Sequence, residues 1–388
     1  MPSFRYGVMG AALLVGLCLV SAQAEAAKHE AKPGDSPGKP GAIIAAAPLQ
    51  GVGAGTKGFR IKYRSTGLNG EPIVVSGMVF IPAGAAPAGG RDVIAWAHPT
   101  TGVVEPCAPS LKADPAKTIW GLENILAAGF VVAATDYPGL GTPGIHPYLI
   151  GKSEGRAVLD SIRAARNLPD SGASGRFAVW GHSQGGHAVL YAGELARHYA
   201  PELKLVGIAA AAPATYLGEL FDDDMSTARG KELTAMALWS WSNLYHHSIA
   251  AVVEPDATTA FEKMAHDCIE SLPELMVLDL TERPFQHRQF LKLNPTKVDP
   301  WKSIMTHNTP GQAPAGAPVL LAQGTADTTV PFDVTKRFGE ALCKQGTRVS
   351  FIKLPGVSHS FVARDSAPAA LAWMTARFQG VQAPSDCE

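Results

Sequence analysis

Short apolar runs alternate with helix-like stretches along most of the chain, and this order restricts the fold more than any other feature of the sequence. Short, mostly apolar runs are typical of strands in a parallel sheet that is covered on both faces. The strand-like runs lie at residues 60–64, 73–81, 93–97, 130–134, 177–180, 205–210, 319–322 and 349–354. Helix-like stretches such as 153–166 and 184–197 lie between them. The sequence therefore predicts an α/β fold with a mostly parallel central sheet, flanking helices and right-handed crossovers.

One interval, which begins after Pro213, is too long for the single helix that would connect two neighbouring strands. It holds about a hundred residues, and a structureless loop of that length is uncommon in a compact domain. Because it contains Trp241 and several helix-like runs, we expect a mainly helical cap or lid at 216–317 over the C-terminal edge of the sheet. The cap divides the core into residues 40–215 and 318–388. The alternative is a second domain that is unrelated to the site.

The N-terminal residues have the pattern of a targeting signal. Arg5 gives a positive start, residues 6–20 are apolar, and A-Q-A at 22–24 has the small-x-small pattern of a cleavage site. The apolar run is short for a membrane span, so we expect a removed signal peptide at 1–24 and an exported protein, periplasmic or secreted. The alternative is an uncleaved anchor. Residues 25–39 are rich in Ala, Lys, Pro and Gly and predict a flexible lead-in.

The cysteines also fit an exported chain. Cys18 leaves with the signal, and an even number remains, which favours two disulfides in an oxidising compartment. Four cysteines allow three pairings. Cys343 and Cys387 both belong to the C-terminal region and are paired here, which leaves Cys107 for Cys268. The alternative is four buried free thiols. No pair has the C-x-x-C spacing of a metal site, and no metal is expected.

A candidate nucleophile lies where the strand-like run 177–180 meets the next helix. The segment between them reads G-H-S-Q-G, a G-x-S-x-G pattern with the serine at its centre. Such a serine needs a sharp, strained strand-to-helix turn, and Gly181 and Gly185 stand where Cβ atoms would not fit. The N-terminus of the following helix points at the serine and favours negative charge there. We therefore predict Ser183 as the nucleophile.

A second G-x-S-x-G match, G-K-S-E-G at 151–155, is not expected to hold a nucleophile. Gly144 and Pro147 interrupt the segment before it, and neither residue suits a central strand. Ser153 therefore lacks the strand that a nucleophile turn needs. We expect it to cap the following helix instead, with Glu154 in the first helical turn.

The acid and the base should follow the serine in that order along the chain. His359 is the only histidine beyond Asp327, and it follows the last strand-like run. Asp327 itself follows the run 319–322 and a glycine turn, whereas the rivals Asp333 and Glu340 fall within or beyond the next helix start. We predict His359 as the general base and Asp327 as the acid that holds its tautomer.

An oxyanion site needs two N–H donors near the nucleophile. The first is expected from the backbone of Gln184, directly after the serine, and the second from the loop after the strand-like run 93–97. Pro99 in that loop has no N–H, so we select Thr100. His98 precedes the serine in the chain and is expected to make a structural hydrogen bond.

Three segments together carry a family resemblance: W-A-H-P-T-T-G at 96–102, D-Y-P-G-L-G at 136–141 with H-P-Y at 146–148, and G-H-S-Q-G-G at 181–186. With them the chain resembles the secretory lipase family of α/β hydrolases, from about residue 40 to the C-terminus. The resemblance implies the α/β-hydrolase fold, a lid-bearing ester hydrolase, and a cap between the sixth and seventh core strands. It also implies disulfides that match Cys107–Cys268 and Cys343–Cys387. Pro99 departs from the family, in which glycine is commoner at this position. The departure concerns the backbone geometry of the oxyanion loop and not the triad.

The residues and the resemblance lead to one expected activity, the serine-dependent hydrolysis of carboxylic esters, acylglycerols or other acyl esters, through an acyl-enzyme. The alternatives are an acyltransferase or peptidase with the same triad, and a non-catalytic ligand-binding protein on this scaffold. No metal or organic cofactor is expected, because the chain has no His-Glu-x-x-His pattern. The net charge of −1 shows no basic excess, so no nucleic-acid partner is expected. We expect a monomer that contacts lipid interfaces transiently through its cap.

Overall fold

The computed structural model describes residues 1–3, 38–50, 53, 55–269 and 290–387. Contacts divide the chain into Met1–Ser36 and Pro37–Glu388, and the fold below is that of the second unit. Nearly all of the expected signal peptide and of the expected lead-in lies outside the described residues. In the part of the chain that is described, no helix combines the length and the apolar character needed to cross a bilayer.

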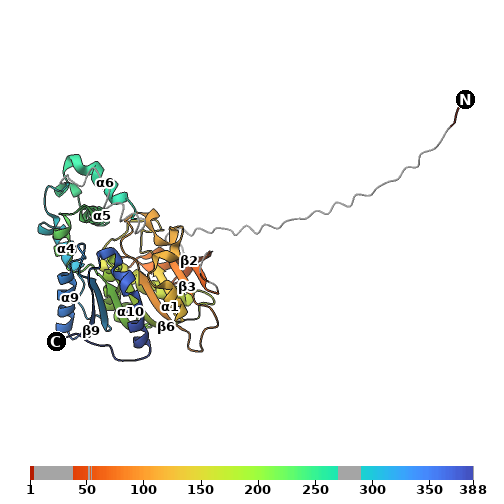
Figure 1. Cartoon of the computed structure of the whole chain (residues 1–388). Helices are drawn as coiled ribbons and strands as arrows, with labels where there is room; N and C mark the ends of the chain where they lie inside the picture. The colour runs from red at the N-terminus through yellow and green to blue at the C-terminus, as the bar shows by residue number, and fades with distance from the viewer. Residues whose placement is uncertain (4–37, 51–52, 54, 270–289, 388) are drawn as a thin grey trace. The chain divides into compact units, whose positions relative to one another are not determined.

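A nine-stranded sheet forms the centre of this unit, with strand order β1-β2-β3-β5-β4-β6-β7-β8-β9 (Figure 1). The strands are β1 (Ile43–Leu49), β2 (Lys57–Thr66), β3 (Pro72–Ile81), β4 (Arg91–Ala97), β5 (Val131–Thr135), β6 (Ala173–His182), β7 (Lys204–Ala211), β8 (Val319–Gly324) and β9 (Val349–Leu354). β1 to β3 and the β3–β5 pair are antiparallel, and all pairs from β5 to β9 are parallel. The predicted α/β fold with a mostly parallel sheet is confirmed.

The strand β1 was missed by the sequence analysis. Its sequence, IIAAAPL, has small side chains in the middle, and these are exposed. β1 forms because its backbone pairs with the edge of β2, which periodicity cannot reveal. The eight predicted strands correspond to β2–β9, so the gap expected between the sixth and seventh core strands is the one between β7 and β8.

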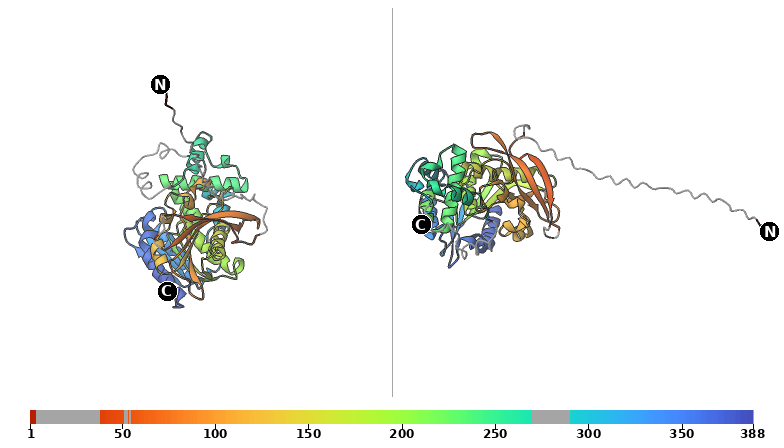
Figure 2. Two further views of the ribbon diagram at one scale, coloured as in Figure 1. Left: turned by 90° about the vertical axis from the view of Figure 1, so that its right-hand side faces the viewer. Right: turned by 90° about the horizontal axis from the view of Figure 1, so that it is seen from above.

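Helices cover both faces of the sheet (Figures 1 and 2). Alternate side chains of β4 point to opposite faces: Val93 and Ala95 pack in one core with α2 and α3, and Ile94 and Trp96 pack in another with α1 and α10. The core helices are α1 (Leu122–Ala127), α2 (Gly151–Asn167), α3 (Gln184–Tyr199), α9 (Phe332–Lys344) and α10 (Val362–Phe378). The short 3-10 helices are η1 (Glu105–Cys107), η2 (Pro109–Leu111), η3 (Pro115–Thr118), η4 (Ile249–Ala251), η5 (Pro255–Ala257), η6 (Pro295–Lys297) and η7 (His359–Phe361).

The interval between β7 and β8 is mainly helical where it is described, and we call residues 216–317 the insertion. Its helices are α4 (Leu217–Asp224), α5 (Ala228–Tyr245), α6 (Thr258–His266) and α8 (Trp301–His307). α5 is tied to the loop at 146–148, because the Trp241 indole N–H donates to Tyr148 O (2.7 Å) and the Ser240 hydroxyl donates to His146 O (2.5 Å). The insertion is therefore anchored to the core through buried polar contacts as well as through packing.

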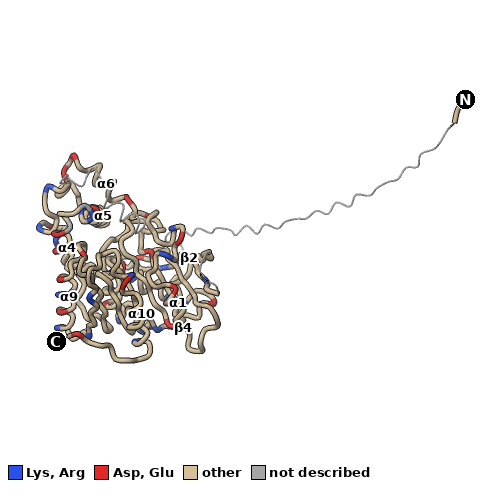
Figure 3. The backbone as a smooth tube through the Cα atoms, viewed as in Figure 1, with Lys and Arg blue, Asp and Glu red and all other residues tan. Residues whose placement is uncertain are grey.

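Charged residues are spread over this unit without a dominant sign. Figure 3 shows basic and acidic residues interspersed along the backbone, in line with the net charge of −1. Near-neutral surfaces of this kind give little long-range electrostatic steering.

Two disulfides join Cys107 to Cys268 and Cys343 to Cys387, the pairs expected from the sequence. We predict that breaking them lowers the melting temperature, because a cross-link restricts the unfolded chain. Sequence separations of 161 and 44 correspond to about 5 and about 4 kcal/mol in the chain-entropy model. Thermal unfolding with and without a thiol reductant measures the effect, and the paired alanine variants separate the two bonds. An unchanged melting temperature after demonstrated reduction would contradict this prediction.

Candidate active site

The nucleophile turn lies between β6 and α3. Ser183 has φ 55° and ψ −116°, a strained conformation for a residue with a side chain. A Cβ at position 181 would collide with the carbonyl of Gly185, and one at Gly185 would collide with the carbonyl of Ala97. The two glycines are therefore required for the close approach of backbone segments, as the sequence pattern indicated.

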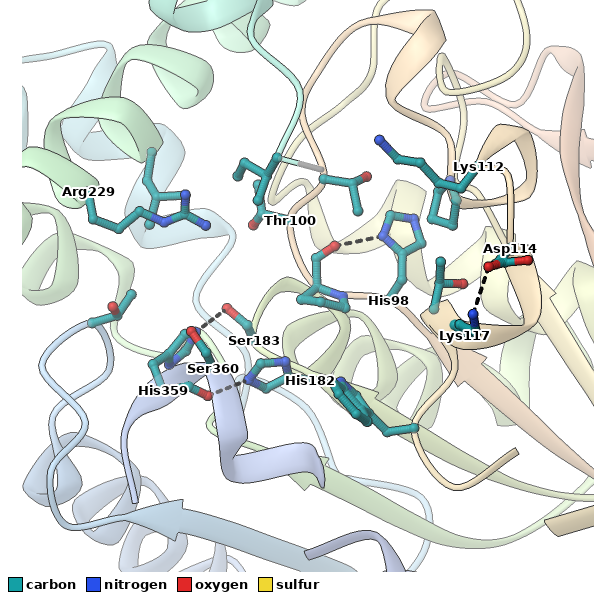
Figure 4. A pocket seen from close by; sticks show the side chains of 18 of the residues that line it. His98, Thr100, Lys112, Asp114, Lys117, His182, Ser183, Arg229, His359 and Ser360 are labelled. Atoms are coloured by element: carbon teal, nitrogen blue, oxygen red, sulfur yellow. Dashed lines mark hydrogen bonds and ion pairs between the residues drawn. The ribbon is translucent and has the colours of Figure 1, made fainter. Parts of the chain in front are cut away.

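Two hydrogen bonds connect Ser183, His359 and Asp327, which lie far apart in the sequence. Nε2 of His359 lies 2.9 Å from Oγ of Ser183, and Nδ1 lies 2.9 Å from Oδ2 of Asp327. Figure 4 shows the serine and the imidazole side by side among the residues that line a pocket. The ring can donate its Nδ1 proton to the carboxylate and accept the hydroxyl proton at Nε2. The structure thus brings the three residues together in an arrangement that can transfer a proton.

Asp327 is held by several donors besides the imidazole. The backbone N–H groups of Thr329 and Val330 donate to Oδ1, and the Gln323 amide donates to Oδ2 at 2.7 Å. Burial acts to raise the pKa of Asp327, but the charge and hydrogen bond of His359, with the Val330 and Gln323 bonds, hold this pKa below its ordinary value. The carboxylate therefore stays ionised and available to the ring.

His182 was not predicted as a site residue, although it lies inside the G-x-S-x-G pattern. Its Nε2 lies 3.0 Å from the carbonyl oxygen of His359, so a neutral ring can donate to the backbone of the candidate base. Burial, and the neighbouring His359 charge, lower the pKa of His182 to about 3. The ring therefore remains neutral over ordinary pH and holds the segment that carries His359.

Two backbone N–H groups, those of Gln184 and Thr100, were predicted from the sequence to bind an oxyanion. Gln184 is the first residue of α3, and Thr100 follows Pro99 in the loop after β4. Thr100 shares a hydrogen bond of 2.9 Å with the Tyr148 hydroxyl through its side chain. Among the hydrogen bonds of the described residues, none uses the backbone N–H of Thr100 or of Gln184. His98 contacts the carbonyls of Pro99 and Asp136 through its ring, which is the structural role expected for it.

Ser183 and His359 lie in a cavity of about 560 Å³. Other walls come from the loop at 98–101, from η2 and η3, from Arg229 and Leu233 of α5, and from Ile269. Figure 4 shows Arg229 on one side and Lys112, Asp114 and Lys117 on the other. The cavity therefore extends from the serine between the core and the insertion. Within the described part of the chain, no cluster of His, Cys, Asp and Glu suits a metal ion.

Comparison with known proteins identifies the family of this chain. A family model described as secretory lipase matches residues 118–386. The chain belongs to the secretory lipase family. A secreted triacylglycerol lipase of Malassezia globosa is 24% identical over 90% of this chain and 77% of its own, and Lipase 6 of Candida albicans is 26% identical over 94% and 82%. A probable inactive lipase of Mycobacterium tuberculosis is 26% identical over 83% and 73%.

Solved structures of similar proteins show the same fold as this secretory lipase family member. Candida antarctica lipase A in its closed state has a TM-score of 0.75 at 21% identity and covers 90% of this chain and 84% of its own. The rice cell wall degrading esterase of Xanthomonas oryzae has a TM-score of 0.73 at 20% identity, over 88% and 98%. The predicted family, the α/β-hydrolase fold and the class of carboxylic ester hydrolase are confirmed.

Proposed function

We propose that this member of the secretory lipase family hydrolyses carboxylic esters with Ser183 as nucleophile, His359 as base and Asp327 as the supporting acid. The observation that carries the proposal is the continuous relay from Ser183 through His359 to Asp327, with 2.9 Å at each step. Because a relative of similar identity is described as a probable inactive lipase, family membership alone is weaker support than this relay.

The reaction begins when His359 takes the proton of Ser183 and the hydroxyl oxygen attacks the ester carbonyl. Charge develops on the carbonyl oxygen, and the free N–H groups of Gln184 and Thr100 bind it. The imidazolium, stabilised by Asp327, then protonates the leaving alcohol, and an acyl-enzyme on Ser183 remains. Water attacks the acyl-enzyme by the same steps in reverse, which releases the acid and restores the serine.

The substrate class is an acyl ester, such as an acylglycerol, bound in the cavity beside Ser183. Relatives described as a triacylglycerol lipase and as a cell wall degrading esterase support an ester substrate without defining its alcohol. In our proposal the insertion at 216–317 acts as the cap of this site and contacts lipid interfaces transiently. The protein acts as an exported monomer, in the periplasm or in the medium, and uses no metal or organic cofactor.

We predict that the purified protein hydrolyses p-nitrophenyl esters and that a fluorophosphonate labels Ser183 in a one-to-one ratio. Rates for acyl chains from acetate to palmitate, with and without an oil–water interface, measure the acyl preference. Peptide substrates and added alcohol acceptors in the same assay distinguish a peptidase or an acyltransferase. A folded protein that neither reacts with the fluorophosphonate nor cleaves any ester would be a binding protein, and the proposal would be wrong.

A further inference from the structure

A fully buried polar cluster lies behind the nucleophile turn, and neither the relay nor the cavity includes it. We call it the Glu154 cluster: Glu154, His146, Gln184 and His187, each 1% exposed or less. Glu154 belongs to the second G-x-S-x-G match, in which Ser153 was expected to cap the helix. That prediction is wrong, because α2 begins at Gly151 and Ser153 is buried inside its first turn.

Glu154 accepts three hydrogen bonds with its two carboxylate oxygens. Oε1 accepts the backbone N–H of Leu149 at 2.9 Å and the side-chain amide of Gln184 at 2.7 Å. Oε2 lies 2.8 Å from Nδ1 of His187. A buried carboxylate is costly unless it is paired and hydrogen-bonded, and these partners meet that requirement.

His187 lies between Glu154 and a backbone carbonyl. Its Nδ1 faces Oε2 of Glu154, and its Nε2 lies 2.8 Å from the carbonyl oxygen of Asn308. These two contacts hold the ring, and the ring in turn holds Oε2 of Glu154.

His146 holds the other hydrogen of the Gln184 amide. Its Nδ1 lies 2.9 Å from the Pro138 carbonyl, which makes Nδ1 the donor and leaves Nε2 as an acceptor. Burial lowers the pKa of His146 to about 4, so the ring stays neutral. Nε2 accepts from the Gln184 amide nitrogen at 2.9 Å. The side chain of Gln184 is thus fixed through both amide hydrogens.

From these contacts we propose that Glu154 is a positioning residue, which holds Gln184 so that its backbone N–H stays aimed at the oxyanion. The inference rests on the proposed function, because it assigns Gln184 to the oxyanion site. Gln184 directly follows the strained Ser183, so a rotation of its backbone turns the N–H away from the reacting carbonyl. A donor that is aligned only in the transition state changes kcat and leaves KM nearly unchanged.

The test uses Glu154→Ala, which removes the acceptor of Gln184, and Glu154→Gln, which can replace it. A glutamine oxygen can accept from Leu149 and Gln184 while its amide donates to a neutral His187, so Glu154→Gln should keep kcat within about 5-fold. Loss of one oxyanion donor lowers kcat about 10²–10³-fold in other serine hydrolases, and we expect a partial loss of about 10–100-fold in Glu154→Ala. KM should change less than about 3-fold.

Asp160→Asn is the matched control. Asp160 is a buried carboxylate on the same helix, α2, and it binds Ser65, Arg163 and Tyr199 away from the nucleophile turn. Its loss should lower the melting temperature without changing kcat. All variants are compared at a temperature where circular dichroism shows that they are folded.

A second readout follows the oxyanion directly. A trifluoromethyl ketone adds reversibly to the Ser183 oxygen, the serine proton moves to His359, and the ketone oxygen becomes the anion. Its inhibition constant should rise in Glu154→Ala by the same factor by which kcat/KM falls, and should stay unchanged in Asp160→Asn. An inhibition constant that stays at the wild-type value in folded Glu154→Ala would overturn the inference and leave the proposed function intact.

If Glu154→Ala does not fold, Gln184→Ala tests the same inference. This variant retains the backbone N–H but loses the side chain that Glu154 holds, so it should show the same loss of kcat. Where both fold, the double variant should lose no more than either single variant, because the two act as one unit. Wild-type kcat in Gln184→Ala, or additive losses, would overturn the inference. A wild-type protein that cleaves no ester would overturn the proposed function and this inference together.

Discussion

Replacing Ser183 with alanine is expected to lower kcat for ester hydrolysis by at least about 10⁴-fold, the largest effect in this protein. The change removes the oxygen that forms the acyl-enzyme, and the remaining groups can only bind and polarise the ester. The fold should be retained, because the turn depends on Gly181 and Gly185, which would collide with neighbouring backbone if they had side chains. Steady-state kinetics with a p-nitrophenyl ester and the loss of fluorophosphonate labelling measure the effect.

Ser153→Ala is the matched control for this experiment. Ser153 is the central serine of the other G-x-S-x-G match, but it is buried in the first turn of α2. We expect its replacement to leave the rate within about 2-fold, as is usual for a small change away from the reacting groups. If Ser183→Ala kept more than a few per cent of the wild-type rate, the nucleophile would have to be assigned to another residue.

Replacing Asp327 with asparagine is expected to lower kcat by about 10³–10⁴-fold at neutral pH. The asparagine amide would donate to Nδ1 of His359, which moves the ring proton to Nε2. The ring would then present a proton to Ser183 instead of accepting one. The ionised state of Asp327, favoured by its lowered pKa, is therefore needed for the tautomer that removes the serine proton.

Asp333→Asn tests whether a carboxylate other than Asp327 contributes to kcat. Asp333 was the sequence rival of Asp327, and it lies exposed in the first turn of α9. Its replacement should leave kcat unchanged. Equal losses in the two variants, or wild-type kcat in Asp327→Asn, would contradict the assigned role of Asp327.

The sequence was most informative for the candidate catalytic residues, because these follow the ends of strands. Ser183, Asp327 and His359 each follow an apolar strand of the parallel sheet, β6, β8 and β9, so strand ends and chain order were enough to select them. The α/β fold followed from the same runs. No distance between the three residues was needed for these predictions.

The features that the sequence analysis missed depend on contacts between distant segments. β1 forms by pairing with an edge, and Ser153 is buried because α2 starts earlier than its capping pattern suggested. His182 was overlooked, and Glu154 was expected only to lie in the first turn of a helix. The contacts of His182 with the His359 carbonyl, and of Glu154 with Gln184 and His187, join segments that are distant in the sequence. Polar residues next to a predicted nucleophile are therefore candidates for positioning it, even when they belong to no known motif.

The disulfide between Cys107 and Cys268 limits how the insertion can be exchanged between relatives. It joins Cys268 of the insertion to Cys107, which follows the loop at 98–101, and the Ile269 N–H donates to Thr101 O. A chimera that receives a foreign insertion must therefore keep a cysteine at 268 and a partner for Thr101. The insertion is not an independent module, and grafting it alone would disturb the loop that carries Thr100.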